Sequence, residues 1–144
     1  PLRAKSPAAP RRVPSWLVAK LFGAFHIPHI PEHSLPAVLG RCEPHNDKDR
    51  ERFRRRFDAI LCSPLSSLEP HLRWAMGVVT RAITGNVVSG IDWKQLLDDL
   101  SIWDRGEEHR LRRDIREIWA ERYFKASKER RLKDVNRNPH DTEP

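Results

Sequence analysis

The chain of 144 residues has the length of one domain and carries 27 Lys and Arg against 20 Asp and Glu, a formal charge of +7. This surplus favours polyanionic partners, either nucleic acid or an anionic membrane surface. A membrane-spanning protein is excluded because no apolar run approaches bilayer length. A disulfide-stapled secreted domain is excluded because Cys42 and Cys62 lack CxxC spacing and disulfide density. We therefore expect a cytoplasmic protein. The chain opens at Pro1 without an initiator Met, which is compatible with a missing N-terminal portion.

The first third of the chain predicts a basic arm followed by two helices. Residues 1–14 are rich in Pro and in basic side chains and have no core pattern, which indicates an extended arm. Ser15 precedes a dense apolar run, and we expect it to cap a buried helix that ends at Pro28. A short helix is predicted over residues 34–42, with Ser34 as its cap and Pro36 in its first turn.

The middle of the chain has the clearest helical stripes. Apolar residues recur three and four apart over residues 53–61, which predicts a helix that follows a loop over residues 43–49 and closes at Ser63. The next helix is expected to be capped by Ser67 and to stop at Gly85.

Two Asp-x-x-Gln/Glu patterns predict the starts of the last helices. Asp92 with Gln95 begins one, and Asp104 with Glu107 begins a long one that runs from about residue 105 to about residue 128. Nowhere do β-branched residues alternate with polar ones over strand length. The sequence therefore predicts an all-α fold, a compact bundle of about five to seven amphipathic helices in one or two lobes. This helical domain would span residues 15–133, followed by a polar tail over residues 134–144.

Arginines crowd the polar faces of three predicted helices. The run Arg54 to Arg56 indicates a surface for several phosphates, although nearby acids could instead pair with these side chains on a solvated helix. On the last predicted helix, basic residues from Arg105 to Arg116 share one flank of the apolar stripe. We expect the nucleic-acid-binding residues to be Arg54, Arg55, Arg56, Arg73, Arg81, Arg105, Arg110, Arg112, Arg113 and Arg116.

No pattern in the chain indicates catalysis or a bound cofactor. Asp98 and Asp99 are adjacent on a predicted helix, so their side chains diverge and cannot share one proton or metal. Three histidines precede Cys42 in a Pro-broken loop, without the spacing of a metal site. We therefore expect no enzyme, no metal and no cofactor. The five Trp are interpreted as core residues, with base stacking by Trp74 as a lesser alternative because it lies off its stripe.

Several segments resemble one family in the same order. The stretch Ile91-Asp92-Trp93-Lys94-Gln95-Leu96-Leu97-Asp98-Asp99-Leu100, followed by Trp103, resembles the "(I/L)DWxxLLxDLxxW" segment of the CasB-type small subunit of the type I-E CRISPR Cascade complex. The segments 55–61, 71–73 and 119–124 are similar to further motifs of that family. One departure is Ala37, where the family has an arginine; Arg41 stands one turn later.

The resemblance implies a non-catalytic, all-helical subunit present as two copies in Cascade and in contact with its other subunits. Such a subunit would hold the backbones of guide RNA and target DNA, including the displaced strand, and would stabilise the R-loop in antiviral defence. Its arginines would position phosphates, because guide pairing reads the sequence. Two rivals remain from the residues alone. One is a basic helical transcription regulator that reads the major groove as a dimer, and the other is a scaffold that docks onto acidic proteins.

Overall fold

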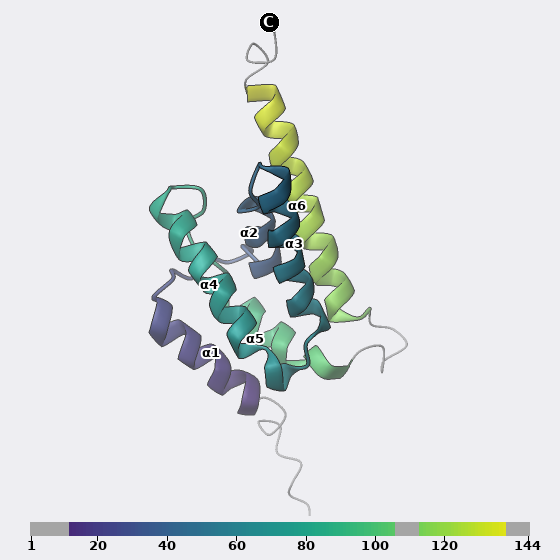
Figure 1. Ribbon diagram of the computed structural model, residues 1–144. Helices are drawn as coiled ribbons and strands as arrows, with labels where there is room; N and C mark the ends of the chain where they lie inside the picture. Colours follow the sequence, from purple (N-terminus) through teal and green to yellow (C-terminus); the bar gives the residue numbers. More distant parts are fainter. Residues whose placement is uncertain (1–11, 106–112, 138–144) are drawn as a thin grey trace, which may run out of the picture.

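The computed structural model describes residues 12–105 and 113–137. Within these ranges the regular elements are helices joined by loops, and one isolated bridge pairs His29 with Ile91. The all-α prediction is confirmed (Figure 1). In chain order the elements are α1 (Arg12–Phe25), α2 (Leu35–Arg41), α3 (Asp47–Cys62), η3 (Leu65–Ser67), α4 (Glu69–Thr84), α5 (Trp93–Ser101), η4 (Trp103–Arg105) and α6 (Ile115–Arg137). Among the described helices, none is both long and apolar enough to cross a membrane.

Helix α4 joins two sides of the bundle. It contacts α1 on one side and α2 and α3 on the other, while α5 packs on α1 and α6 packs on α2 and α3 (Figure 1). One cluster of buried apolar side chains runs through both sides and includes Leu21, Phe57, Met76, Leu100 and Trp119. The polar faces of α3 and α4 are therefore fixed by a common core.

The tightest helix pair is α2 with α6, and Gly40 makes it possible. A Cβ atom on Gly40 would overlap the backbone carbonyl oxygen of Tyr123 on α6. Without that atom the two backbones approach closely, which brings the loop after α2 against the middle of α6.

Two predicted caps are wrong, and in each case the helix begins at a different residue. Ser15 does not cap α1, because it lies inside the helix, whose described part already includes Arg12 and Pro14. Ser67 belongs to η3, and α4 begins after Leu68 with Pro70 in its first turn. The described helices thus begin a little before residue 15 and end a little after residue 133, while residues 1–11 and 138–144 lie outside the described part.

The predicted start of the last helix is also wrong. Helix α6 begins at Ile115, where Asp114 caps it by accepting the N–H of Arg116 at 2.9 Å. The expected cap, Asp104, instead accepts the backbone N–H of Leu65 at 3.1 Å. The side chain of Asp104 therefore holds the loop before α4, and η4 ends at Arg105.

Candidate nucleic-acid interface

Helix α3 sends its successive arginines in different directions. The side chain of Asn46 caps the helix by accepting the N–H groups of Lys48 and Asp49 at 2.9 and 3.2 Å. Phe53 and Phe57 are buried and fix its rotation. Because successive side chains on an α-helix are rotated by about 100° about its axis, neighbouring arginines meet different surroundings.

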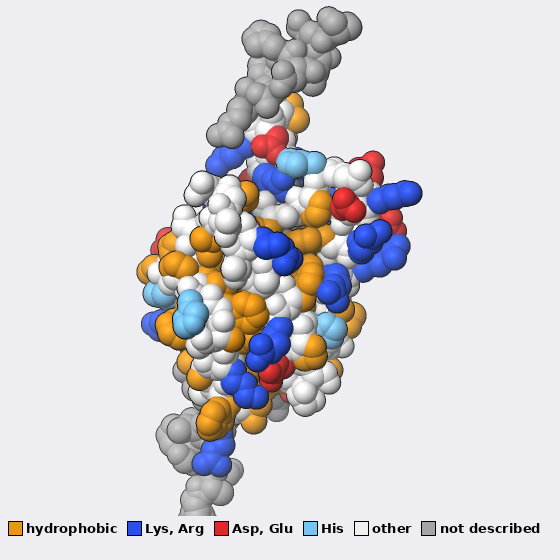
Figure 2. All heavy atoms as spheres, turned by 60° about the vertical axis from the view of Figure 1, so that its left-hand side comes forward, with side chains coloured by type: hydrophobic (Ala, Val, Ile, Leu, Met, Phe, Trp, Pro, Cys, Tyr) orange, Lys and Arg blue, Asp and Glu red, His pale blue; other side chains and the backbone are white. Residues whose placement is uncertain are grey.

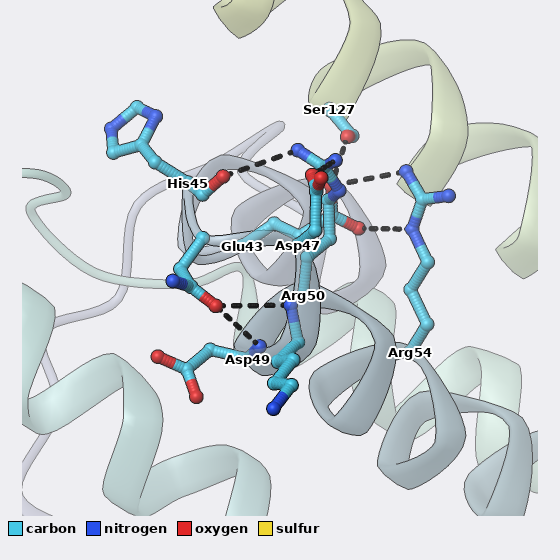
Figure 3. A network of polar contacts seen from close by, with 9 residues as sticks. Glu43, His45, Asp47, Asp49, Arg50, Arg54 and Ser127 are labelled. Carbon is cyan, nitrogen blue, oxygen red and sulfur yellow. Dashed lines mark hydrogen bonds and ion pairs between the residues drawn. The ribbon is translucent and has the colours of Figure 1, made fainter.

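Arg54 points toward α6 and enters a buried polar network centred on Glu43 (Figure 3). The Glu43 carboxylate is only 2% exposed; it accepts two hydrogen bonds from Arg54 at 2.7 and 3.1 Å. On α6, the Tyr123 hydroxyl donates to the same carboxylate at 2.5 Å and the Ser127 hydroxyl at 2.7 Å. Arg54 therefore joins α3 to the loop after α2 and to α6. We call Glu43, Arg54, Tyr123 and Ser127 the Glu43 network.

The charge of Glu43 is stabilised by these donors. Burial alone would raise the pKa of Glu43, but the hydrogen bonds from Arg54, Tyr123 and Ser127 together hold that pKa below its usual value. Burial and the hydrogen bond to Glu43 raise the pKa of Tyr123, so its hydroxyl remains a donor. The network is thus a carboxylate paired with a guanidinium inside the fold.

Four more of the predicted arginines are paired with acidic side chains. Three pairs lie on the surface: Arg55 with Glu51 at 2.8 Å, Arg73 with Glu69 at 3.1 Å, and Arg113 with Glu121 at 2.7 Å. Arg116 is more enclosed, with Asp104 at 3.5 Å and the Trp103 ring beneath its guanidinium. Exposed pairs of this kind contribute little to stability, so their arginines can exchange a carboxylate for a phosphate.

The remaining described candidates carry no ion pair with the described part of the chain. These are Arg56, Arg81 and Arg105, of which Arg105 lies on η4. Arg110 and Arg112 lie outside the described residues. The single flank expected from Arg105 to Arg116 does not exist as one helix face, because Arg105 precedes the undescribed segment and α6 begins only after Asp114.

Arg56 contacts the Trp74 ring from α3, and Arg81 stands seven residues after Trp74, on the same face of α4. The Cζ atom of Arg56 lies 5.3 Å from the centre of the Trp74 ring. Arg81 folds back along α4, so that its Nη1 would lie 3.6 Å from a Cβ on Gly77, the residue one turn after Trp74. Arg52 stands one turn before Arg56 on α3 and is exposed without an ion pair to the described residues. We call Arg52, Arg56, Arg81 and Trp74 the α3–α4 basic face.

Figure 2 shows the side of the molecule on which α1 and α4 come forward. Lys and Arg side chains spread over it from the lower end to the upper right, with hydrophobic side chains between them. Lys20 of α1 reaches Glu69 of α4 at 3.3 Å, the same carboxylate that pairs with Arg73.

Sequence reasoning missed Arg52 as a site residue. The four-residue spacing between Arg52 and Arg56 indicates a shared helix face and could have found it. The run of acids before Phe53 hid the signal, although Asp47 pairs with Arg50 and Glu51 with Arg55.

A groove of about 960 Å³ lies beside the second half of α6, and its charge is mixed. Arg41 and Lys133 line it together with Glu129 and Asp134. Arg41, which stands one turn after Ala37, is therefore on the surface of this groove rather than on the α3–α4 basic face. No group of three His, Cys, Asp or Glu within residues 12–105 and 113–137 is placed to hold a metal ion.

Comparison with known proteins identifies one family. The model of the family described as CRISPR-associated protein Cse2 matches residues 2–124, a span that includes α1 to α5, the whole α3–α4 basic face and the start of α6. No curated protein matches the chain.

Proposed function

The chain belongs to the CRISPR-associated Cse2 family of type I-E Cascade small subunits, and we propose that its α3–α4 basic face binds nucleic-acid phosphates in that complex. In this proposal the subunit contacts the backbones of the guide RNA–target DNA heteroduplex or of the displaced strand. It thereby stabilises the R-loop in antiviral defence and works as a positioning subunit, with a second copy beside it.

One observation carries the proposal: Arg52, Arg56 and Arg81 have no carboxylate partner within the described residues, whereas Arg54 and Arg55 beside them do. A guanidinium without a partner can offer paired N–H donors to a phosphate, and each phosphate neutralised releases counterions. Because Phe53 and Phe57 fix α3 in the core, little backbone entropy is lost on binding.

The proposed role requires no chemistry from the protein. A guanidinium stays protonated and cannot act as a general base, so these side chains hold charge rather than transfer protons. Guide pairing supplies sequence recognition, and the protein needs to contribute only shape and positive charge. The binding is therefore tolerant of sequence and sensitive to salt.

The other predicted arginines divide by their surroundings. The exposed pairs of Arg55, Arg73 and Arg113 make these three residues secondary phosphate contacts in the proposal. Arg54 and Arg116 are used inside the fold, and we assign them a structural role. Arg105, Arg110 and Arg112 remain predicted contacts.

The test is to assemble Cascade with guide RNA and measure how fast target DNA dissociates. We expect faster dissociation without this subunit, and the same acceleration when it carries the three substitutions Arg52→Glu, Arg56→Glu and Arg81→Glu but still co-purifies with the complex. The single substitutions Arg56→Glu and Arg55→Glu make a matched pair with the same charge change one residue apart, and Arg56→Glu should have the larger effect. Wild-type dissociation from a complex that contains the triple variant would overturn the proposal.

A further inference from the structure

The five Trp differ in what their indole N–H groups contact. Three donate to internal acceptors: Trp93 to the Ile27 carbonyl at 2.8 Å, Trp103 to the Ser63 carbonyl at 2.9 Å, and Trp119 to the Asp99 carboxylate at 2.9 Å. The N–H groups of Trp16 and Trp74 have no acceptor among the described residues. Since an enclosed indole N–H normally finds a partner, these two rings face solvent or a ligand.

Trp74 is held firmly although it is not part of the buried stripe of α4. Leu72, Ala75 and Met76 form that stripe and are fully buried, while Trp74 is half-buried beside them. Its ring packs against Phe53, with 5.0 Å between ring centres and an angle of 63° between ring planes. One part of the indole is thus anchored in the core while the guanidinium of Arg56 lies over its face.

One guanidinium therefore lies over the half-exposed indole, and a second belongs to the same face of α4. Arg56 reaches Trp74 from α3, while the Arg81 guanidinium folds back along α4 as far as Gly77, one turn after Trp74. No described acidic side chain pairs with either arginine, so their charge is available to phosphates near the ring. Flat π-faces with flanking cations are the features that bind single strands, because a base can stack while its phosphates are neutralised.

We propose that Trp74, Arg56 and Arg81 form a site for one unpaired nucleobase and its flanking phosphates. The base stacks on the indole or on the guanidinium that covers it, and the two arginines hold the neighbouring phosphates. Bases within a duplex already stack on one another, so this site selects single strands. The inference rests on the proposed function, because it names the form of nucleic acid that the α3–α4 basic face takes.

The experiment compares two oligodeoxynucleotides of equal length, one of thymidines and one with abasic residues, by fluorescence anisotropy with the full chain. The abasic strand keeps the phosphates but lacks the bases. We expect it to bind about tenfold more weakly, with the same dependence on salt. Trp74→Leu should weaken binding of the thymidine strand by about the same factor and leave the abasic strand unchanged. Trp74→Phe keeps a stacking ring and should retain most of the affinity.

Each of the other outcomes contradicts a different part of the proposal. If wild-type protein binds both strands equally and with steep salt dependence, phosphate binding stands and the stacking site is wrong. If Trp74→Leu weakens both strands equally, Trp74 acts through the fold, and thermal unfolding of the variant will show it. If neither strand binds in a salt-dependent way, the proposed function fails as well. The wild-type comparison requires no variant to fold.

Discussion

Two arginines that are two residues apart on α3 belong to regions with opposite properties. Arg54 enters the Glu43 network, where it is 33% exposed and bound by a carboxylate that is almost fully buried. Arg56 belongs to the α3–α4 basic face, where its guanidinium covers an aromatic ring and pairs with no described acid. Residues of the same type therefore have different roles: Arg54 stabilises the fold, and Arg56 remains available to a ligand.

The difference shows that a count of arginines overstates a binding surface. Rotation about the helix sends Arg54 toward α6 and Arg56 toward α4, and the residues found there decide the role of each. The acid that captures Arg54 lies 11 residues earlier in the chain, and the hydroxyl groups that share it lie on α6, 80 and 84 residues from Glu43. Positive charge is useful to a polyanion only where the fold has not already neutralised it.

Glu43→Gln should have the largest effect on stability. It removes a buried negative charge that accepts hydrogen bonds from Arg54, Tyr123 and Ser127. The Arg54 guanidinium then has no counter-ion. We expect the free energy of unfolding, measured in urea, to fall by about 3 kcal/mol, because breaking one side of a buried pair is costly. Salt dependence of nucleic-acid binding should not change.

The matched control is Glu51→Gln, which breaks the exposed pair with Arg55. Its unfolding free energy should stay within about 0.5 kcal/mol of wild type. Equal destabilisation by the two substitutions would mean that the Glu43 network is no more important than a surface pair.

Gly40→Ala should have the next largest effect, because it separates the helices on which the Glu43 network depends. The added methyl group would overlap the Tyr123 carbonyl of α6. We expect a loss of about 2 kcal/mol in the free energy of unfolding, the usual cost of overpacking.

A matched helical glycine exists in α1, where a Cβ on Gly23 would meet nothing within 4 Å. Gly23→Ala should therefore raise stability by up to about 1 kcal/mol through helix propensity. A Gly40→Ala variant as stable as wild type would contradict the close contact between α2 and α6.

Acid should weaken the Glu43 network before it affects the α3–α4 basic face. The pKa of Glu43 is lowered in the fold, so its contribution to stability is complete above its ordinary pKa of about 4.5 and is lost as pH falls below that value. The gap in unfolding free energy between wild type and Glu43→Gln should therefore narrow below about pH 4.5. Burial raises the pKa of Asp99, so protonation of Asp99 favours the folded state as pH falls. This effect is the same in wild type and in Glu43→Gln, and it cancels in the gap between their unfolding free energies. A gap that stays constant down to pH 3 would show that the charge of Glu43 is not what stabilises the network.

The fold could be predicted because its signals are local. Apolar residues three and four apart define α3 and α4, and Asp92 caps α5 by accepting the N–H of Gln95 at 2.9 Å, as its spacing predicts. Only half of that capping box forms, because the Gln95 side chain donates forward to Asp99 at 2.8 Å.

The start of α6 could not be predicted with the same rules. Asp104-x-x-Glu107 and Asp114-x-x-Glu117 are equally good caps in the sequence. The fold uses the second because the Asp104 side chain accepts from Leu65, which is 39 residues away. A contact at that separation has no signal in a single sequence.

For the candidate site, contacts within one helix could be predicted from the sequence, but contacts between helices could not. Pairs four residues apart, such as Arg55 with Glu51 and Arg73 with Glu69, follow from helix geometry. The pairing of Arg54 with Glu43 and the position of Arg56 over Trp74 depend on how α3 packs against α6 and α4. Sequence reasoning therefore located the basic helix but not which of its arginines are free.

Salt titration of single-strand binding by Arg54→Gln and Arg56→Gln separates the two regions, since both variants lose one charge from the same helix. We expect Arg56→Gln to reduce the slope of log affinity against log salt by about 0.7 while its unfolding midpoint stays at the wild-type value. Arg54→Gln should keep the wild-type slope and lower the unfolding midpoint. If Arg54→Gln reduced the slope and Arg56→Gln did not, the phosphates would bind elsewhere than on the α3–α4 basic face.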